Sequence, residues 1–481
     1  MPLFRASPTL IALIVACAFF MENLDGAAIT IVLPQIAKTF LISPSAASLG
    51  VTIYMVSLAI FLAMSGWAAD RFGPRNFFCW AIAVFTLASV ACGLSTHFWF
   101  FVVTRAVQGA AAAFMSPVGR VIVLRTAPKS ELMRAFGITI WPGLVAPIIG
   151  QPIGGLIATY LSWKWIFFLN VPIGVAGILL LLTFVDNHRG EHSRRLDLVG
   201  LTLTALSLSA MLYGLDLISH EHPDWRLGGG LIIAGLLVGV QAVRHASGHD
   251  YPLIDVSLAE VRTFAFTTIS GGTFFRIAMG AAPFLLPLLF QIGFGMTAFD
   301  SSLLMLAYGG GNLAMKAMTN PILKRFGFRR VLVVNGVVVI ISVLSFAFLV
   351  PRVPLFLILA SLILAGLTRS LQFTALNTLA FADIRQSAMS SASTMQTMLQ
   401  QVAFAFGIAL GAVILSVSAE FRAGAGASIG VPDFQVAFAV STLMTIAALP
   451  WLVKLATDAG DEISGHSRAR SSARSQAVTE D

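Results

Sequence analysis

The chain has 481 residues, of which 57% are hydrophobic and only 11% are charged, and its mean hydropathy is +0.87. Soluble proteins carry about 25% charged residues, so this composition excludes a soluble globular protein and predicts an all-α polytopic membrane protein. The net charge of +8 does not indicate nucleic-acid binding, because basic residues of such proteins collect in cytoplasmic loops. The three cysteines have no partners at metal-ligand spacing, and no metal site is expected.

Fourteen segments are apolar and long enough to cross a bilayer as helices, which takes roughly 20 residues each. They are residues 9–34, 47–69, 77–95, 98–124, 133–159, 165–185, 196–219, 227–247, 263–291, 299–321, 330–350, 354–378, 392–418 and 434–456. The first segment lacks a small-residue cleavage site, so it is expected to be a retained span rather than a signal peptide.

Lysine and arginine are distributed unevenly between alternate connections. An even number of spans places both termini on one side, and the connections on that side hold most of the basic residues. The opposite side holds only Lys38, Lys164, Arg226, Arg352 and Arg422. The positive-inside rule therefore predicts that both termini are cytoplasmic. We also expect residues 459–481, which are rich in Ser, Arg and small residues, to form a disordered tail.

Two carboxylates lie three residues apart in the first apolar segment. A charge at the centre of a membrane helix costs at least ~2.5–3.5 kcal/mol, so it usually faces the bundle interior and marks a pathway. Residues i and i+3 share a face of a helix, so Glu22 and Asp25 are expected to point into the same space. The fourth segment carries Arg105 at a compatible depth. Proton transfer is the main interpretation of the acids, and a static ion pair or a hydrogen bond to a neighbouring helix is the alternative.

Two short sequences recur eight segments apart along the chain. Residues 71–75 (RFGPR) resemble residues 325–329 (RFGFR), and residues 104–108 (TRAVQ) resemble residues 368–372 (TRSLQ). Their common offset suggests two similar six-helix bundles, and repeats that flank a midplane site are typical of transporters. The predicted units are an N-terminal bundle at 1–195, an inserted helix pair at 196–248, a C-terminal bundle at 249–458 and a cytoplasmic tail at 459–481.

Several motifs resemble those of a known family. Residues 66–75, GWAADRFGPR, resemble the loop 2–3 signature of the major facilitator superfamily, G-x-L-A-D-R-x-G-R-R/K. Residues 24–34, LDGAAITIVLP, are similar to L-D-x-T-I-V-N-V-A-L-P in the first helix of its fourteen-helix drug:proton antiporter branch (EmrB/QacA type), with Ala27 in place of threonine. Residues 105–109, RAVQG, resemble the fourth-helix R-x-x-Q-G motif.

The fifth and sixth segments extend this resemblance. Residues 146–155, APIIGQPIGG, resemble the antiporter signature G-P-x-x-G-P-x-x-G-G, with Ala146 for the first glycine and the second proline one place late. Residues 163–174, WKWIFFLNVPIG, resemble W-R-W-I-F-x-I-N-x-P-x-G of the same branch. The resemblance spans residues 9–456 and implies a fourteen-helix transporter, but it leaves the substrate open.

The deep charged residues supply the candidate transport site. We expect proton coupling at Glu22, Asp25 and Arg105. Arg276 and Arg369 are deep cations of the second bundle, which could bind an anionic group or pair with backbone carbonyls. The predicted substrate contacts are Glu22, Asp25, Gln108, Arg276 and Arg369.

Conformational gating is implied for two stretches. By resemblance, Asp70 pairs with basic groups and helix ends across the two bundles and latches the outward-facing state, whereas Arg75 also fits plain positive-inside anchoring. The glycines of the fifth segment allow close helix contact and its prolines allow bending, so packing explains this stretch as well as gating does. The predicted gating residues are Gly66, Asp70, Arg71, Gly73, Arg75, Pro147, Gly150, Pro152, Gly154 and Gly155.

The leading interpretation is a proton-coupled secondary transporter that exports small amphipathic compounds, as in multidrug efflux, by alternating access in a bacterial inner membrane. The alternatives are a facilitator or symporter of a specific, possibly anionic, metabolite, and a membrane sensor that transports nothing. No enzyme is expected, because metal-ligand clusters, nucleotide motifs and nucleophile triads are missing from the sequence. The expected partners are a small-molecule substrate, protons and the lipid bilayer. A monomer without nucleic acid, and without a cofactor besides the proton gradient, is expected.

Overall fold

The computed structural model is all-helical over the residues that it describes, which are 7–126, 132–186, 196–219, 223–249, 252–253, 255–424 and 427–460. Within them, twelve helices are long and apolar enough to cross a membrane. The chain is therefore a multi-pass membrane protein. Asp70 lies in a described helix but its side chain is outside the described part, as is the predicted tail beyond residue 460.

The elements run in this order: α1 (Pro8–Phe40), α2 (Pro44–Ala47), α3 (Leu49–Leu62), α4 (Ser65–Phe72), α5 (Pro74–Gly93), α6 (Phe98–Thr126), α7 (Leu132–Tyr160), α8 (Lys164–Phe168), α9 (Asn170–Phe184), α10 (Leu198–Ser219), α11 (Trp225–Gly248), η1 (Val256–Glu260), α12 (Arg262–Phe264), η2 (Ala265–Ile269), α13 (Gly271–Leu288), η3 (Leu289–Gly293), α14 (Ala298–Phe326), α15 (Phe328–Phe346), α16 (Leu355–Leu379), η4 (Gln386–Ala388), α17 (Met389–Ala423) and α18 (Val431–Val453).

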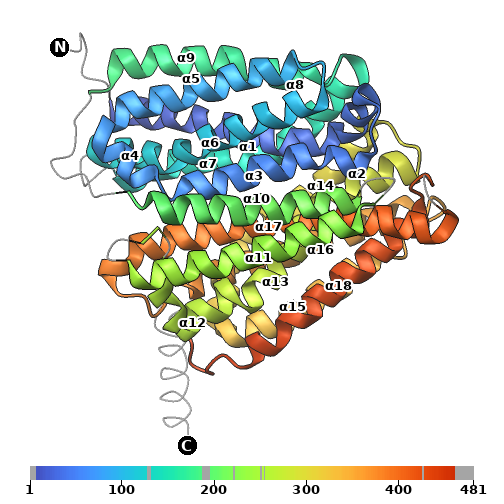
Figure 1. Cartoon of the computed structure of the whole chain (residues 1–481). Coiled ribbons are helices and arrows are strands. Elements are labelled where there is room, and N and C mark those ends of the chain that lie inside the picture. Colours follow the sequence, from blue (N-terminus) through green and yellow to red (C-terminus); the bar gives the residue numbers. More distant parts are fainter. Residues whose placement is uncertain are drawn as a thin grey trace, which may run out of the picture.

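The long helices lie roughly parallel to one axis, with α4 at one end of the molecule and α2 at the other (Figure 1). We call these the α4 end and the α2 end. Helices α1–α9, which we call the first half, gather in the upper part of the view. The second half consists of α13–α18, of which α13 and α15–α18 lie below the first half in this view. Helix α10 lies at their boundary and packs against α3, α17 and its own neighbour α11. Leu212 and Leu215 of α10 share a buried cluster with Val56 and Ala405.

Two of the fourteen predicted spans, which correspond to α7 and α14, are not among these twelve helices. Helix α7 has 29 residues, and Val145–Tyr160 is its continuous apolar stretch within the described side chains. Helix α14 also has 29 residues. It carries Asp300, Lys316, Lys324 and Arg325, and these charged residues lower its mean hydropathy below that of the twelve spanning helices.

The two copies of the first recurring sequence, residues 71–75 and 325–329, adopt the same local structure. Gly73 has φ +83° and ends α4 where α5 begins, and Gly327 has φ +74° and ends α14 where α15 begins. Such φ values favour glycine, since other side chains are strained there. Arg75 donates to the Val185 carbonyl at the end of α9, and Arg329 donates to the Val453 carbonyl at the end of α18. The repeat predicted from sequence therefore extends to these contacts.

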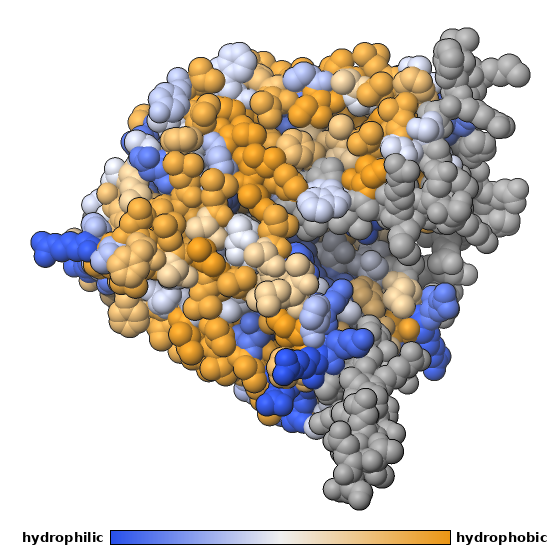
Figure 2. Space-filling view, turned by 180° about the vertical axis from the view of Figure 1, so that it is seen from behind, coloured by the Kyte–Doolittle hydropathy of each residue, from blue (hydrophilic) through white to orange (hydrophobic). Residues whose placement is uncertain are grey.

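The packing differs between the two ends of the molecule. One continuous apolar cluster at the α2 end combines residues of both halves, including Val32, Phe284 and Leu288. Towards the α4 end, the first half has its own cluster around Phe78 and the second half has another around Phe328. The halves are thus sealed together at the α2 end. The outer surface between the ends is dominated by apolar side chains (Figure 2), as expected for contact with lipid.

Candidate functional site

A buried ion pair lies at the centre of the first half. Arg105 of α6 donates from Nη1 to Asp25 Oδ2 of α1 over 2.6 Å, and both side chains are fully buried. Arg105 Nε also donates to the Gly50 carbonyl at 3.1 Å, and the guanidinium lies 4.2 Å from the centre of the Tyr54 ring. A guanidinium over an aromatic face gains cation–π attraction, which grows when water is excluded.

Polar side chains from three further positions complete this network. Asp25 Oδ1 accepts hydrogen bonds from Gln108 Nε2 at 3.2 Å and Asn170 Nδ2 at 3.1 Å. Both amides also donate to Ser89 Oγ, at 2.7 and 3.2 Å. Helices α1, α5, α6 and α9 are therefore joined around one carboxylate. Because a buried carboxylate is costly unless it is paired and hydrogen-bonded, these contacts explain how the charge is held.

Sequence reasoning missed three members of this network: Tyr54, Ser89 and Asn170. Asn170 lies inside one of the motifs used for the family resemblance, and a buried amide in an apolar helix is itself a signal that it has a partner. Tyr54 and Ser89 carry no such signal, because single hydroxyls are common in membrane helices. Their placement follows only from the packing of α3 and α5 on α6.

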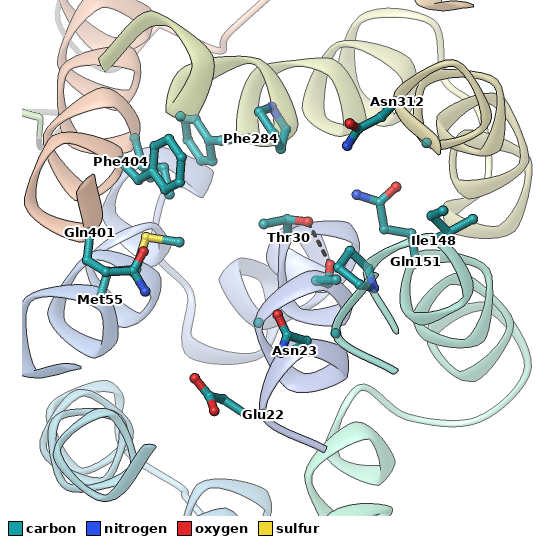
Figure 3. A pocket seen from close by; sticks show the side chains of 18 of the residues that line it. Glu22, Asn23, Thr30, Met55, Ile148, Gln151, Phe284, Asn312, Gln401 and Phe404 are labelled. Atoms are coloured by element: carbon teal, nitrogen blue, oxygen red, sulfur yellow. Dashed lines mark hydrogen bonds between the residues drawn. The ribbon is translucent and has the colours of Figure 1, made fainter. Parts of the chain in front are cut away.

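A cavity of about 330 Å³ lies between the two halves, lined by α1, α3, α7, α13, α14, α16 and α17. Its wall combines hydrogen-bonding groups with aromatic and aliphatic ones. Figure 3 shows Glu22, Asn23 and Gln151 on the side of the first half, facing Asn312, Phe284 and Phe404 across the open space. A concave, mostly apolar site with a few convergent polar groups is typical of small-molecule binding.

Glu22 lines this cavity from α1, and its carboxylate projects towards the space in Figure 3. Among the described residues, its Oε2 atom is buried and has no hydrogen-bond partner. The expectation that Glu22 and Asp25 share one space is not met, because Asp25 points into the first half. Residues three apart on a helix differ by about 60° in direction. Because α1 lies between the cavity and the interior of the first half, this angle directs Glu22 into the cavity and Asp25 into the interior.

The other predicted substrate contacts also divide into residues that line the cavity and residues that are buried within one half. Arg369 lines the cavity and lies 5.5 Å from the centre of the Tyr308 ring. Gln108 is fully buried in the Asp25 network. Arg276 of α13 is buried and donates to the Thr267 carbonyl of η2 and to Asn377 Oδ1 of α16, in line with the alternative that it pairs with backbone carbonyls. In this structure Asp25, Gln108 and Arg276 do not line the cavity, and their contact with substrate stays a prediction.

The predicted gating loop is the turn between α4 and α5. Gly66 and Arg71 are exposed there, and Gly73 makes the turn with positive φ. Arg75 is bound within its own half, to Val185 and Asn76. A contact of this loop with the second half is therefore not made by Arg75 in this structure, and the latch predicted for Asp70 rests on a side chain outside the described part.

The glycines of α7 bring other helices close. A Cβ atom on Gly154 would lie 3.0 Å from the Ala28 carbonyl of α1, and one on Gly150 would lie 3.2 Å from the Leu24 carbonyl. A Cβ on Gly155 would lie 2.7 Å from the Ala298 carbonyl of α14, in the other half. Pro147 lines the cavity, and Pro152 is half-buried. Helix α7 thus contacts both halves, and this fits both the packing and the gating interpretation.

The motifs, the two halves and the cavity between them match a known family over most of the chain. A family model described as the Major Facilitator Superfamily matches residues 12–408. The chain belongs to the major facilitator superfamily. Members of this superfamily are transporters, so the chain is a secondary transporter that acts on a small molecule and is not an enzyme.

Two curated members are similar in sequence. The probable transport protein HsrA of Haemophilus influenzae is 32% identical over 454 residues, which cover 94% of this chain and 97% of that protein. The putative multidrug resistance protein MdtD of Escherichia coli is 32% identical over 404 residues, covering 84% and 85%.

Solved structures of other superfamily members share the fold at low identity. A D-xylose–proton symporter has a TM-score of 0.66 at 15% identity, covering 92% of this chain and 97% of its own. The POT family transporter PepTSo also has a TM-score of 0.66, at 13% identity, covering 93% of this chain and 97% of its own. These likenesses support the superfamily fold.

Proposed function

We propose that this superfamily member is a proton-coupled exporter of small amphipathic compounds that works by alternating access. The observation that carries the proposal is the carboxylate of Glu22 on a mostly apolar cavity wall, whose Oε2 atom has no hydrogen-bond partner in the described part of the chain, with a second carboxylate sealed behind it. A carboxylate placed in this way can hold either a proton or a cation. The multidrug resistance name of the relative MdtD agrees with a broad apolar cavity.

The cycle follows from competition for Glu22. The protonated side chain is neutral and favours release of a cationic substrate on one side of the membrane, and loss of the proton on the other side restores the charge that binds it. Because one carboxylate cannot hold both ligands, proton entry drives substrate exit. A change of charge at Glu22 alters the electric field on the Asp25–Arg105 ion pair, which lies one helical turn away. The ion pair therefore takes part in the coupling indirectly.

The remaining roles belong to gating. The seal at the α2 end includes hydrogen bonds between the halves from Gln291 Nε2 to the Ile31 carbonyl and from the Phe299 N–H to Thr159 Oγ1. Opening to that side must break both. The close approach of Gly155 to α14 supports a rocking contact there. We place Asp70 and its loop at the opposite, cytoplasmic gate.

We further propose the fourteen-helix drug:proton antiporter branch, in which α7 and α14 also cross the membrane beside the twelve apolar helices. The units are then bundles at 1–195 and 249–458 with the inserted pair 196–248 between them. Both termini and the α4 end face the cytoplasm of a bacterium, and the membrane is the inner one. Basic residues at the α4 end, such as Arg71 and Arg325, support this orientation. A monomer powered by the proton gradient, without a bound cofactor, suffices.

A second candidate is transport of an anionic metabolite, because Arg369 also lines the cavity and has no carboxylate partner among the described residues. Replacing Arg369 with Gln separates the two. A cation exporter keeps or gains activity when a like charge leaves the cavity, whereas an anion transporter loses most of it. Uptake or efflux of a lipophilic cation and of an organic anion, measured in the same cells, distinguishes these outcomes.

The export proposal is tested in bacterial cells that lack their main drug pumps. Expression of the intact protein is expected to raise tolerance to lipophilic cations and to lower the accumulation of a fluorescent cationic dye, and a protonophore is expected to abolish the effect. Unchanged tolerance and dye accumulation across a panel of such compounds would contradict the drug-exporter assignment.

A further inference from the structure

Three side chains that can bind metal meet at the α4 end of the pair α10–α11, away from the central cavity. Asp197 directly precedes α10, His245 lies in the last turn of α11, and His249 is its C-cap. One ligand atom of each lies within 4.8 Å of the other two. His245 Nε2 is already 2.9 Å from Asp197 Oδ1. The transport cycle uses none of these groups.

Asp197 is a buried residue whose carboxylate is held in place by backbone groups. Its Oδ1 accepts from the Gly200 N–H at 2.7 Å, and its Oδ2 accepts from the Leu253 N–H at 3.3 Å. The carboxylate folds over Gly200, where any side chain would collide with it. These hydrogen bonds orient the carboxylate, as second-shell hydrogen bonds orient metal ligands.

The donor set suits a transition metal ion. Two imidazoles and one carboxylate are ligands that Zn²⁺ accepts with bonds of about 2.0–2.2 Å, which in a tetrahedral site places ligand atoms about 3.3 Å apart. The Asp197–His245 separation of 2.9 Å is that of a hydrogen bond, and it lengthens by about 0.4 Å when both atoms bind one ion. His245 lies in the last turn of α11 and His249 is its C-cap, and their ring centres lie 5.2 Å apart. His249 is exposed, and one of its ring nitrogens lies within 4.8 Å of the ligand atoms of Asp197 and His245.

We propose that Asp197, His245 and His249 form a site for a divalent transition metal ion of the Zn²⁺ class, with water in the fourth position. The expectation of no metal site rested on cysteine spacing. It missed this group because the carboxylate lies 48 residues before the first imidazole, and only the antiparallel packing of α10 on α11 brings them together.

The bound ion ties three segments at one point. Asp197 fixes the start of α10, the two histidines fix the end of α11, and the Leu253 N–H connects the chain that leads into the second half. Helix α10 packs against α3 and α17, one from each half. The ion therefore restrains the inserted pair where it meets both moving parts, and its occupancy adjusts how firmly the pair is held.

The test uses the purified full-length protein in detergent, stripped with a chelator and prepared without a histidine tag. Titration with ZnCl₂ by calorimetry is expected to give one site per chain, and Zn²⁺ is expected to raise the Tm. His245→Ala and His249→Ala each remove a ligand, and binding is expected to weaken by at least ~10-fold, the lower end of what loss of a supporting group costs. Co²⁺ should give visible absorption bands in the wild type that both variants lose.

His97→Ala is the matched control, because His97 is exposed at the α2 end, and it is expected to bind Zn²⁺ like the wild type. His249 is on the surface, so its variant keeps the fold even if His245→Ala does not. Absence of Zn²⁺ binding to the wild type would overturn the proposal. Binding that both histidine variants retain would overturn it equally, since the ion would then lie elsewhere.

Discussion

At the scale of single residues, the two acids of α1 have different surroundings. Asp25 is neutralised by Arg105 and fully hydrogen-bonded, whereas Glu22 Oε2 has no hydrogen-bond partner among the described residues and faces the cavity. A paired, buried charge is suited to holding helices together, and an unpaired one is suited to exchanging ligands. We therefore expect substitutions of Asp25 to affect stability first and those of Glu22 to affect transport first.

Breaking the buried pair on one side is expected to destabilise the protein. Removing one partner of a buried ion pair costs about 3–5 kcal/mol, because the other charge stays buried and uncompensated. Arg105→Met should therefore lower the Tm in detergent markedly, and the double variant Asp25→Asn/Arg105→Met should recover part of the loss. Glu260→Gln, at an exposed carboxylate, serves as the control and should leave the Tm unchanged. An equal loss in the single and double variants would contradict this interpretation.

Sequence alone predicted much of this site but not its geometry. The depths of Asp25 and Arg105 were enough to anticipate their contact, because charges in an apolar helix must find partners. The separation of Glu22 from Asp25 was not predictable, since it depends on α1 lying where the bundle meets the cavity. Arg369 and Arg105 occupy matching motifs, yet one faces the cavity and the other is buried. The first half has an acid to pair with Arg105, and no such partner of Arg369 is found in the described residues.

At the scale of helices, the turns that join α4 to α5 and α14 to α15 require glycine. Gly73→Ala forces a side chain into a backbone conformation with positive φ, which costs about 1–3 kcal/mol. We expect a lower Tm for this variant. Gly66→Ala is the matched control from the adjacent helix, where a Cβ meets nothing within 4 Å and alanine favours helix by up to ~1 kcal/mol. Equal stability of the two variants would contradict a role for the turn.

The contact of α7 with α14 makes a second prediction for a helix. Gly155→Leu inserts a side chain where a Cβ alone would already lie 2.5 Å from Ser302 Oγ and 2.7 Å from the Ala298 carbonyl, so the seal at the α2 end should loosen. Spin labels on the exposed residues Lys38 and Asp300 report the distance between the halves there. We expect a longer distance in the variant. Gly310→Leu, at an open position of α14, should leave the distance unchanged.

At the scale of the whole molecule, the halves share one apolar cluster at the α2 end and have separate clusters towards the α4 end. Under the proposed orientation this is an inward-facing arrangement. Sequence predicted the repeat and the alternation of charge between loops, because each depends on local composition. It did not predict which end is closed, since the same sequence must adopt both arrangements.

Proton coupling through Glu22 is tested most directly with purified protein in liposomes. Efflux of a lipophilic cation is driven by an imposed pH gradient, and the wild type is compared with Glu22→Gln and Asp25→Asn. We predict that the gradient accelerates transport by the wild type and that Glu22→Gln abolishes this acceleration while the protein remains folded. Asp25→Asn should lose both stability and transport. Gradient-driven efflux that is unchanged in both variants would contradict the proposed coupling.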